Sequence, residues 1–213
     1  MILDRLHYEL TNTYIRRESL FVIADESALS SRRRRSRRNR SRFRKKQESE
    51  DSQTVFIGRH NGDSQTPLDT LIFTTTANFV FTPDARESDL VEVIYYPVED
   101  RETGEIVLRR REYKMPVGDV DVEREDCTAE LHCTDFVVYR GIRGIGFRYY
   151  TDDRFGDRFD QDEWDSTSAR DEEQYNRVPR AVEITLVLES SAGTDLLFRT
   201  IVAVPAGFAT GRK

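Results

Sequence analysis

The sequence predicts an α+β domain in which one N-terminal helix packs on antiparallel β-sheets. An apolar stripe of helical period occupies residues 1–20, and seven to nine segments with strand patterns follow it. Two of these segments flank a short polar turn, as in a β-hairpin. With 213 residues, 37% of them hydrophobic, the chain is long enough for one packed core with tails.

The first element is a helix over residues 1–20. Its apolar residues recur at three- and four-residue steps and form one stripe: Leu3, Leu6, Leu10 and Tyr14. The stripe is already in full period at its first residue, and no capping residue precedes it. We therefore expect earlier turns of this helix to be missing before Met1.

A short strand or connection is expected over residues 21–29, and a low-complexity segment follows over residues 30–53. Within it, Arg32–Lys46 holds 11 basic residues and no acidic one. Because the net charge is −6, the remainder of the chain is strongly acidic. The segment has one large apolar residue, Phe43, and cannot offset the entropy of ordering, so we expect a disordered insertion.

A β-rich head is expected over residues 54–205. Residues 54–58 and the β-branched run 69–77 read as strands. Residues 89–98 and 105–113 flank a polar turn that contains Gly104, which predicts a hairpin. An acidic loop with one short strand is expected over residues 118–133.

Three strands are expected near the C-terminus, over residues 142–150, 177–189 and 196–205. In the second, apolar residues fall at every other position, as in a half-buried strand: Val182, Ile184, Leu186 and Leu188. The glycines around Arg143 are in the wrong order for a phosphate loop and favour a bulge or a close backbone approach. Residues 206–213 are expected to be a frayed tail.

The sequence offers little catalytic or cofactor chemistry. It contains no nucleophile-elbow, metalloprotease or Walker motif, so we expect no enzyme and no cofactor. The acidic loop that contains Trp164 could hold Ca²⁺ through several carboxylates. An EF-hand alignment fails because Thr151 stands where Asp is required, and a solvated loop is favoured. The candidate Ca²⁺ ligands are Asp152, Asp153, Asp157, Asp160 and Asp162.

Cys127 and Cys133 lie six positions apart in a polar stretch. They could be two reduced thiols, or a disulfide that stabilises the fold by about 2 kcal/mol through loop entropy. A zinc site that also uses His132 is disfavoured, since the spacing matches no usual pattern. The thiol and disulfide interpretations both stay open.

No run approaches the roughly 20 apolar residues that cross a bilayer, and no signal peptide is present. We expect the chain as given to be soluble.

The basic tract Arg32–Lys46 could bind nucleic acid or another anion. A solvated insertion is favoured over that alternative, because the acidic body would repel phosphates and only Phe43 could stack.

Several motifs in order resemble the J-type minor pseudopilins of bacterial type II secretion. The C-terminal half of that family is similar to IRGIGFRYYTDD (142–153), the downstream Trp164 and RVPRAVEITLVLE (177–189). PLDTLIFTTT (67–76) resembles the family's L-x-F-T-T strand, and the hairpin at 89–112 resembles its counterpart. LDRLHYELTNTYI (3–15) looks like the lower half of the family's long N-terminal helix. The resemblance covers most of the chain outside the basic tract.

The resemblance implies a non-enzymatic subunit with a periplasmic head and an inner-membrane helix that is cleaved and methylated. Such subunits join I-type and K-type minor pseudopilins at the tip of a pseudopilus that supports protein export across the outer membrane. The processing site and the apolar half of the helix are absent from this sequence. We therefore expect a truncated form that contacts the membrane only through the missing helix, and we expect no nucleic-acid partner. A minor pilin of a related type IV filament is an alternative.

On the pseudopilin interpretation, the stripe Leu3, Leu6, Leu10 and Tyr14 faces partly the chain's own sheet and partly neighbouring helices. Tyrosines on exposed sheet faces are further candidate partner contacts, because Tyr is enriched at interface anchors. These are Tyr95, Tyr96, Tyr149 and Tyr150.

Overall fold

The computed structural model describes residues 2–15, 54–77, 90–118, 122, 127–128, 132–152 and 158–208. The helices in this part of the chain are α1 (Ile2–Thr11) and α2 (Pro205–Phe208). The strands are β1 (Phe56–Arg59), β2 (Thr70–Thr75), β3 (Val91–Glu99), β4 (Ile106–Tyr113), β5 (Cys133–Arg140), β6 (Ile142–Asp152), β7 (Arg158–Gln161), β8 (Trp164–Asp165), β9 (Ala181–Glu189) and β10 (Asp195–Ala203). The predicted basic insertion and the segment 21–29 lie outside the described residues.

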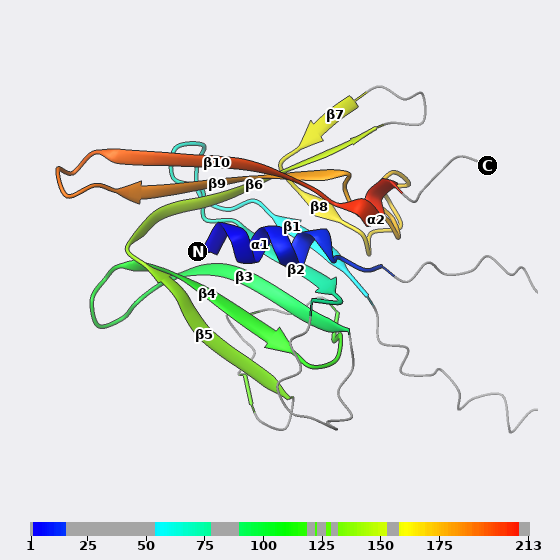
Figure 1. The fold of residues 1–213 in the computed structure, drawn as a ribbon, viewed down its shortest axis with the longest axis horizontal. Helices are drawn as coiled ribbons and strands as arrows, with labels where there is room; N and C mark the ends of the chain where they lie inside the picture. The colour runs from blue at the N-terminus through cyan, green and yellow to red at the C-terminus, as the bar shows by residue number, and fades with distance from the viewer. Residues whose placement is uncertain are drawn as a thin grey trace, which may run out of the picture.

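The strands form two antiparallel sheets, and α1 lies between them (Figure 1). One sheet has the order β5-β4-β3-β2-β1-β8 and the other the order β10-β9-β6-β7. Leu6 and Leu10 of α1 belong to one apolar core with residues of both sheets, such as Phe73 and Ile184. The predicted architecture of one helix on antiparallel sheets is therefore present.

The alternating patterns produce the strands that they predict. In β9, Val182, Ile184 and Leu186 are buried in the core, whereas Glu183 and Thr185 are more accessible. The predicted hairpin is formed by β3 and β4, which pair from Glu92–Tyr113 to Glu99–Ile106. Its turn includes Gly104, whose φ of 71° suits glycine better than other residues.

The glycines of β6 allow both a bulge and a close approach, as the sequence indicates. The register of β6 on β9 shifts between Ile142 and Gly144. A Cβ on Gly144 would lie 2.8 Å from the carbonyl oxygen of Pro67. The buried Asp69 carboxylate accepts the Phe147 N–H at 2.8 Å, so the loop before β2 is fixed against β6.

The helix prediction over residues 1–20 is wrong for residues 12–15, and residues 16–20 lie outside the described residues. The Asn12 carbonyl accepts hydrogen bonds from Thr75 Oγ1 and from the Thr76 N–H, both at 3.0 Å. The Tyr14 N–H donates to the Thr74 carbonyl at 2.9 Å. Because these bonds direct the chain along the end of β2, the helical ladder stops there.

The prediction of a frayed tail is also wrong for residues 206–208, which belong to α2. Gly207 is buried there, and a Cβ at this position would collide with the Pro179 carbonyl. No helix among the described residues is long and apolar enough to cross a membrane.

Candidate partner-binding surface

The apolar stripe of α1 divides between the core and the surface. Leu6 and Leu10 are fully buried by the chain's own two sheets. Leu3 is half-buried beside that core, and Tyr14 is 40% exposed. In this structure, the accessible parts of the predicted stripe are therefore its two ends.

A buried ion cluster fixes α1 to the six-stranded sheet. The Glu9 carboxylate is 1% exposed and accepts hydrogen bonds from the Tyr95 hydroxyl at 2.6 Å and from Arg110 Nη2 at 2.9 Å. Arg5 Nε lies 3.1 Å from the same carboxylate. Burial and then the Glu9 charge raise the pKa of Tyr95 well above its usual value. Arg110 also pairs with Glu112 at 2.7 Å, so its charge is shared by two carboxylates.

Sequence reasoning missed this cluster. The i, i+4 spacing of Arg5 and Glu9 was the one local signal, and it is equally typical of an exposed helix face. Arg110 lies 101 positions from Glu9 and stands within three consecutive arginines, so no local pattern marks it as the buried one. The cluster holds the axis of α1 in a fixed position, and thereby fixes the surface at the start of the helix.

An apolar groove of about 580 Å³ opens at the start of α1. It lies between the helix, β5 of one sheet, and β9 and β10 of the other. The lining residues are Ile2, Leu3, Arg5, Val138, Tyr139, Leu186, Leu188 and Phe198. Since seven of these eight side chains are apolar or aromatic, the groove suits an apolar side chain or helix face of another protein.

The predicted tyrosine surface is wrong for three of its four residues. Tyr95 and Tyr149 are fully buried and Tyr96 is 7% exposed, because each points into a core. Tyr150 is half-buried, and its hydroxyl donates to Glu183 at 3.0 Å. Large exposed apolar residues gather instead on β10, and they are Leu196, Leu197, Phe198 and Ile201.

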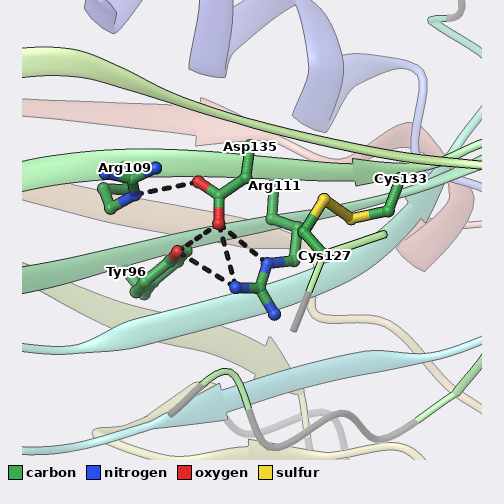
Figure 2. The surroundings of a disulfide bond; sticks show 6 residues. All are labelled: Tyr96, Arg109, Arg111, Cys127, Cys133 and Asp135. Carbon is green, nitrogen blue, oxygen red and sulfur yellow. Dashed lines mark hydrogen bonds and ion pairs between the residues drawn. A yellow bond between two sulfur atoms is a disulfide. The ribbon is translucent and has the colours of Figure 1, made fainter. Parts of the chain in front are cut away.

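The two cysteines are joined in a disulfide at the start of β5, with Cα atoms 5.3 Å apart. Close to it, Asp135 accepts hydrogen bonds from the Tyr96 hydroxyl at 2.6 Å and from Arg109 Nε at 2.9 Å (Figure 2). Arg111 donates to the same carboxylate at 2.9 Å. Burial alone would raise the pKa of Asp135, but these bonds outweigh it and lower that pKa. The ion cluster fixes β5 on β4, and the disulfide fixes the segment before β5 to that strand.

The candidate Ca²⁺ ligands that the structure describes are paired with arginines. Asp160 and Asp162 lie 3.2 and 3.3 Å from Arg148, and Asp152 pairs with Arg180. Asp153 and Asp157 lie outside the described residues. Within the described ranges, no three His, Cys, Asp or Glu side chains are grouped so that they could hold a metal ion.

Of the comparisons with known proteins, the match to a family model supports the motifs. A chain in the crystal structure of the GspK-GspI-GspJ complex from the enterotoxigenic Escherichia coli type 2 secretion system is similar at 14% identity and a TM-score of 0.47. The match covers 95% of this chain and 92% of that chain, and the likeness is too weak to carry an argument. No curated protein matches. The family model described as type II secretion system (T2SS), protein J, matches residues 38–200, which is most of the sequence. The chain therefore belongs to the protein J family of the type II secretion system.

Proposed function

We propose that this chain is a minor pseudopilin, a structural subunit of the pseudopilus tip that supports protein export across the outer membrane. Membership of the protein J family supports the assignment. The main structural observation behind this proposal is that α1 packs between two sheets and that an apolar groove opens at the start of this helix. In this role the protein acts by packing against other subunits and catalyses no reaction.

The proposed partners are the I-type and K-type minor pseudopilins. Helices associate through apolar side chains at i, i+3 and i+4 positions, and a groove with apolar walls accommodates such a stripe. Ile2 and Leu3 of α1 would contact a partner helix together with Val138 of β5. Because Leu6 and Leu10 are already occupied by the core, they would act indirectly by holding the helix in place.

We place the head of this subunit in the periplasm. The disulfide between Cys127 and Cys133 supports this location, since disulfides persist in oxidising compartments such as the periplasm. The nucleic-acid alternative depends on residues 32–46, which the structure does not describe, and no described feature favours it. The type IV pilin alternative is not favoured either, because the matching family belongs to type II secretion.

The test is to mix this purified head with the heads of its I-type and K-type partners and to measure the complex by sedimentation. We expect a complex of all three. Leu3→Asp should weaken it at least about tenfold, because a charge would enter the apolar groove. Met115→Asp introduces the same charge at a residue that is 62% exposed and remote from the groove, and should leave the affinity unchanged.

A head that stays alone while the two partners still bind each other would overturn the proposal. So would equal effects of Leu3→Asp and Met115→Asp, because the groove would then have no special part in binding.

A further inference from the structure

β10 is an edge strand, and no strand in the described part of the chain pairs with its outer side. It pairs with β9 on one side and stands at the end of its sheet. No hydrogen bond joins its nine residues to any other strand that the structure describes. Four of its large apolar side chains are at least 44% exposed, namely Leu196, Leu197, Phe198 and Ile201. Proteins usually protect such an edge, because it is a template for another strand.

The hairpin turn determines which backbone groups of β10 face outward. The Ser190 N–H donates to the Thr194 carbonyl at 2.8 Å, so these residues form a hydrogen-bonded pair. In an antiparallel ladder, such pairs alternate with pairs that do not bond. Leu196 and Phe198 therefore direct their N–H and C=O groups to β9. Asp195, Leu197, Arg199 and Ile201 direct theirs to the open edge.

We infer that β10 pairs antiparallel with β10 of a second copy of this chain, with the two-fold axis at Leu197. In this register Leu197 lies opposite Leu197 of the second copy, and Asp195 lies opposite Arg199 in both directions. All of these residues present outward backbone groups, so each facing pair can exchange N–H···O bonds. The two β10 strands are complementary in charge, because their antiparallel arrangement brings Asp195 of each copy to Arg199 of the other.

The charges select this register over its neighbours. A two-fold axis at Arg199 would place two guanidinium groups directly opposite each other, which is unfavourable. An axis at Phe198 would place Asp195 opposite Ile201 and Arg199 opposite Leu197. Neither Asp195 nor Arg199 would then face an opposite charge. An axis at Leu197 creates two attractive Asp195–Arg199 pairs and one apolar pair on the same face.

The other face is compatible with the same register, since it places Leu196 opposite Phe198 of the second copy. Within one chain, Arg199 lies 3.2 Å from Glu183 and Asp195 lies 3.6 Å from Arg143. The side chains of Arg199, Asp195 and Arg143 are each more than half exposed, whereas Glu183 is 12% exposed, so the charges of Arg199 and Asp195 remain accessible to new cross-strand pairs. The isologous strand pairing goes beyond the proposed function: Phe198 also lines the groove at α1, whereas Asp195, Leu197 and Arg199 lie outside it.

Sedimentation of the purified chain across a concentration series tests the inference. We expect a reversible dimer that salt weakens, with a dissociation constant raised at least about tenfold by Arg199→Glu. The charge-swapped variant Asp195→Arg/Arg199→Glu should restore the dimer, because opposite charges again face each other.

Leu197→Pro removes one outward N–H and should abolish dimerisation, whereas Leu197→Thr, which keeps that N–H, should dimerise more strongly than Leu197→Pro.

A cysteine at the two-fold axis tests the register directly. Facing Cα atoms in a hydrogen-bonded pair lie about 5.5 Å apart, within the range that a disulfide spans. Leu197→Cys should therefore form a cross-linked dimer under mild oxidation. Ile201→Cys is the matched control, since the two new thiols would lie about 25 Å apart. The native cysteines do not interfere because they are already joined to each other.

Three results would overturn the inference. The first is a chain that stays monomeric through the high-micromolar range. The second is a dimer that Arg199→Glu does not weaken or that the charge swap does not restore. The third is equal cross-linking of Leu197→Cys and Ile201→Cys. If the edge bound an I-type or K-type head and never itself, this strand pairing would be refuted while the proposed function survived.

Discussion

Two carboxylates, Glu9 and Asp135, hold α1 and β5 to strands β3 and β4. Glu9 bonds to Tyr95 and Arg110 inside the core. Asp135 bonds to Tyr96, Arg109 and Arg111, and Tyr96 belongs to a second apolar cluster, which also contains Val55, Ile57, Ile72, Ile94 and Tyr113. Each replaces water by several donors, which is the condition for burying a charge at tolerable cost.

Removing one member of the buried pair should destabilise the fold severely. Glu9→Gln removes one of the two carboxylates that neutralise the buried Arg110 guanidinium. Breaking a buried pair typically costs about 3–5 kcal/mol, and Glu112 offsets part of that cost because it still faces the guanidinium. Urea unfolding should show a midpoint well below that of the wild type. The matched control is Glu102→Gln, in an exposed turn, which should leave the midpoint unchanged. Equal midpoints for the two variants would show that the ion cluster does not fix α1.

Asp135 should contribute to acid sensitivity. Its pKa is lowered in the folded state, so its contribution is present above the unfolded value of about 3.9 and is lost as the pH falls through the folded pKa. Asp135→Asn should therefore be less stable than the wild type at pH 7, while its free energy of unfolding falls less steeply below about pH 4. Urea titrations at a series of pH values measure both. Parallel pH profiles for the two proteins would contradict the assignment.

At the scale of elements, the structure depends on how loops are attached to strands. The disulfide attaches the segment before β5 to the strand itself, and Cys133 packs beside the apolar cluster on the outer face of the six-stranded sheet. The loop before β2 is attached to β6, where Gly144 and Gly146 leave room for Pro67.

Reduction of the disulfide should lower the free energy of unfolding by about 2 kcal/mol, as expected for a short closed loop. Urea unfolding with and without reductant measures this change. In the variant Cys127→Ser/Cys133→Ser the reductant should have no effect. An unchanged midpoint of the wild-type chain on reduction would show that the bond does not stabilise the segment.

Gly144→Ala should destabilise the fold by about 1–3 kcal/mol, because the new methyl group would overlap the Pro67 carbonyl and the loop would have to move. Arg143→Ala is the neighbouring control at an exposed position and should be close to neutral. Thermal unfolding of both variants compares them. A Gly144→Ala variant as stable as Arg143→Ala would contradict the close approach.

Local patterns were sufficient to predict most strands, and long-range contacts explain what they missed. Val182, Ile184 and Leu186 predict β9, because burial of one face of a strand places apolar residues at every second position of the sequence. The end of α1 is set by Thr75 and Thr76, more than 60 positions away, so no local signal marks it. The tyrosines were misplaced because a strand pattern does not tell which face of a sheet the second layer covers.

At the scale of the whole molecule, α1 lies between the two sheets (Figure 1) and packs against both. The start of the helix borders an apolar groove. The buried ion cluster keeps the helix in one position, and the two sheets enclose it. Under the proposed function, the groove that remains open would receive another subunit.

Amide hydrogen exchange of this head, alone and with the I-type and K-type heads, shows whether partners bind at the groove. We expect partner binding to slow exchange at the start of α1 and in β5 around Val138, both of which border the groove, while the hairpin turn at residues 100–105 exchanges as before. Unchanged exchange around the groove, or protection confined to surfaces remote from it, would contradict the account.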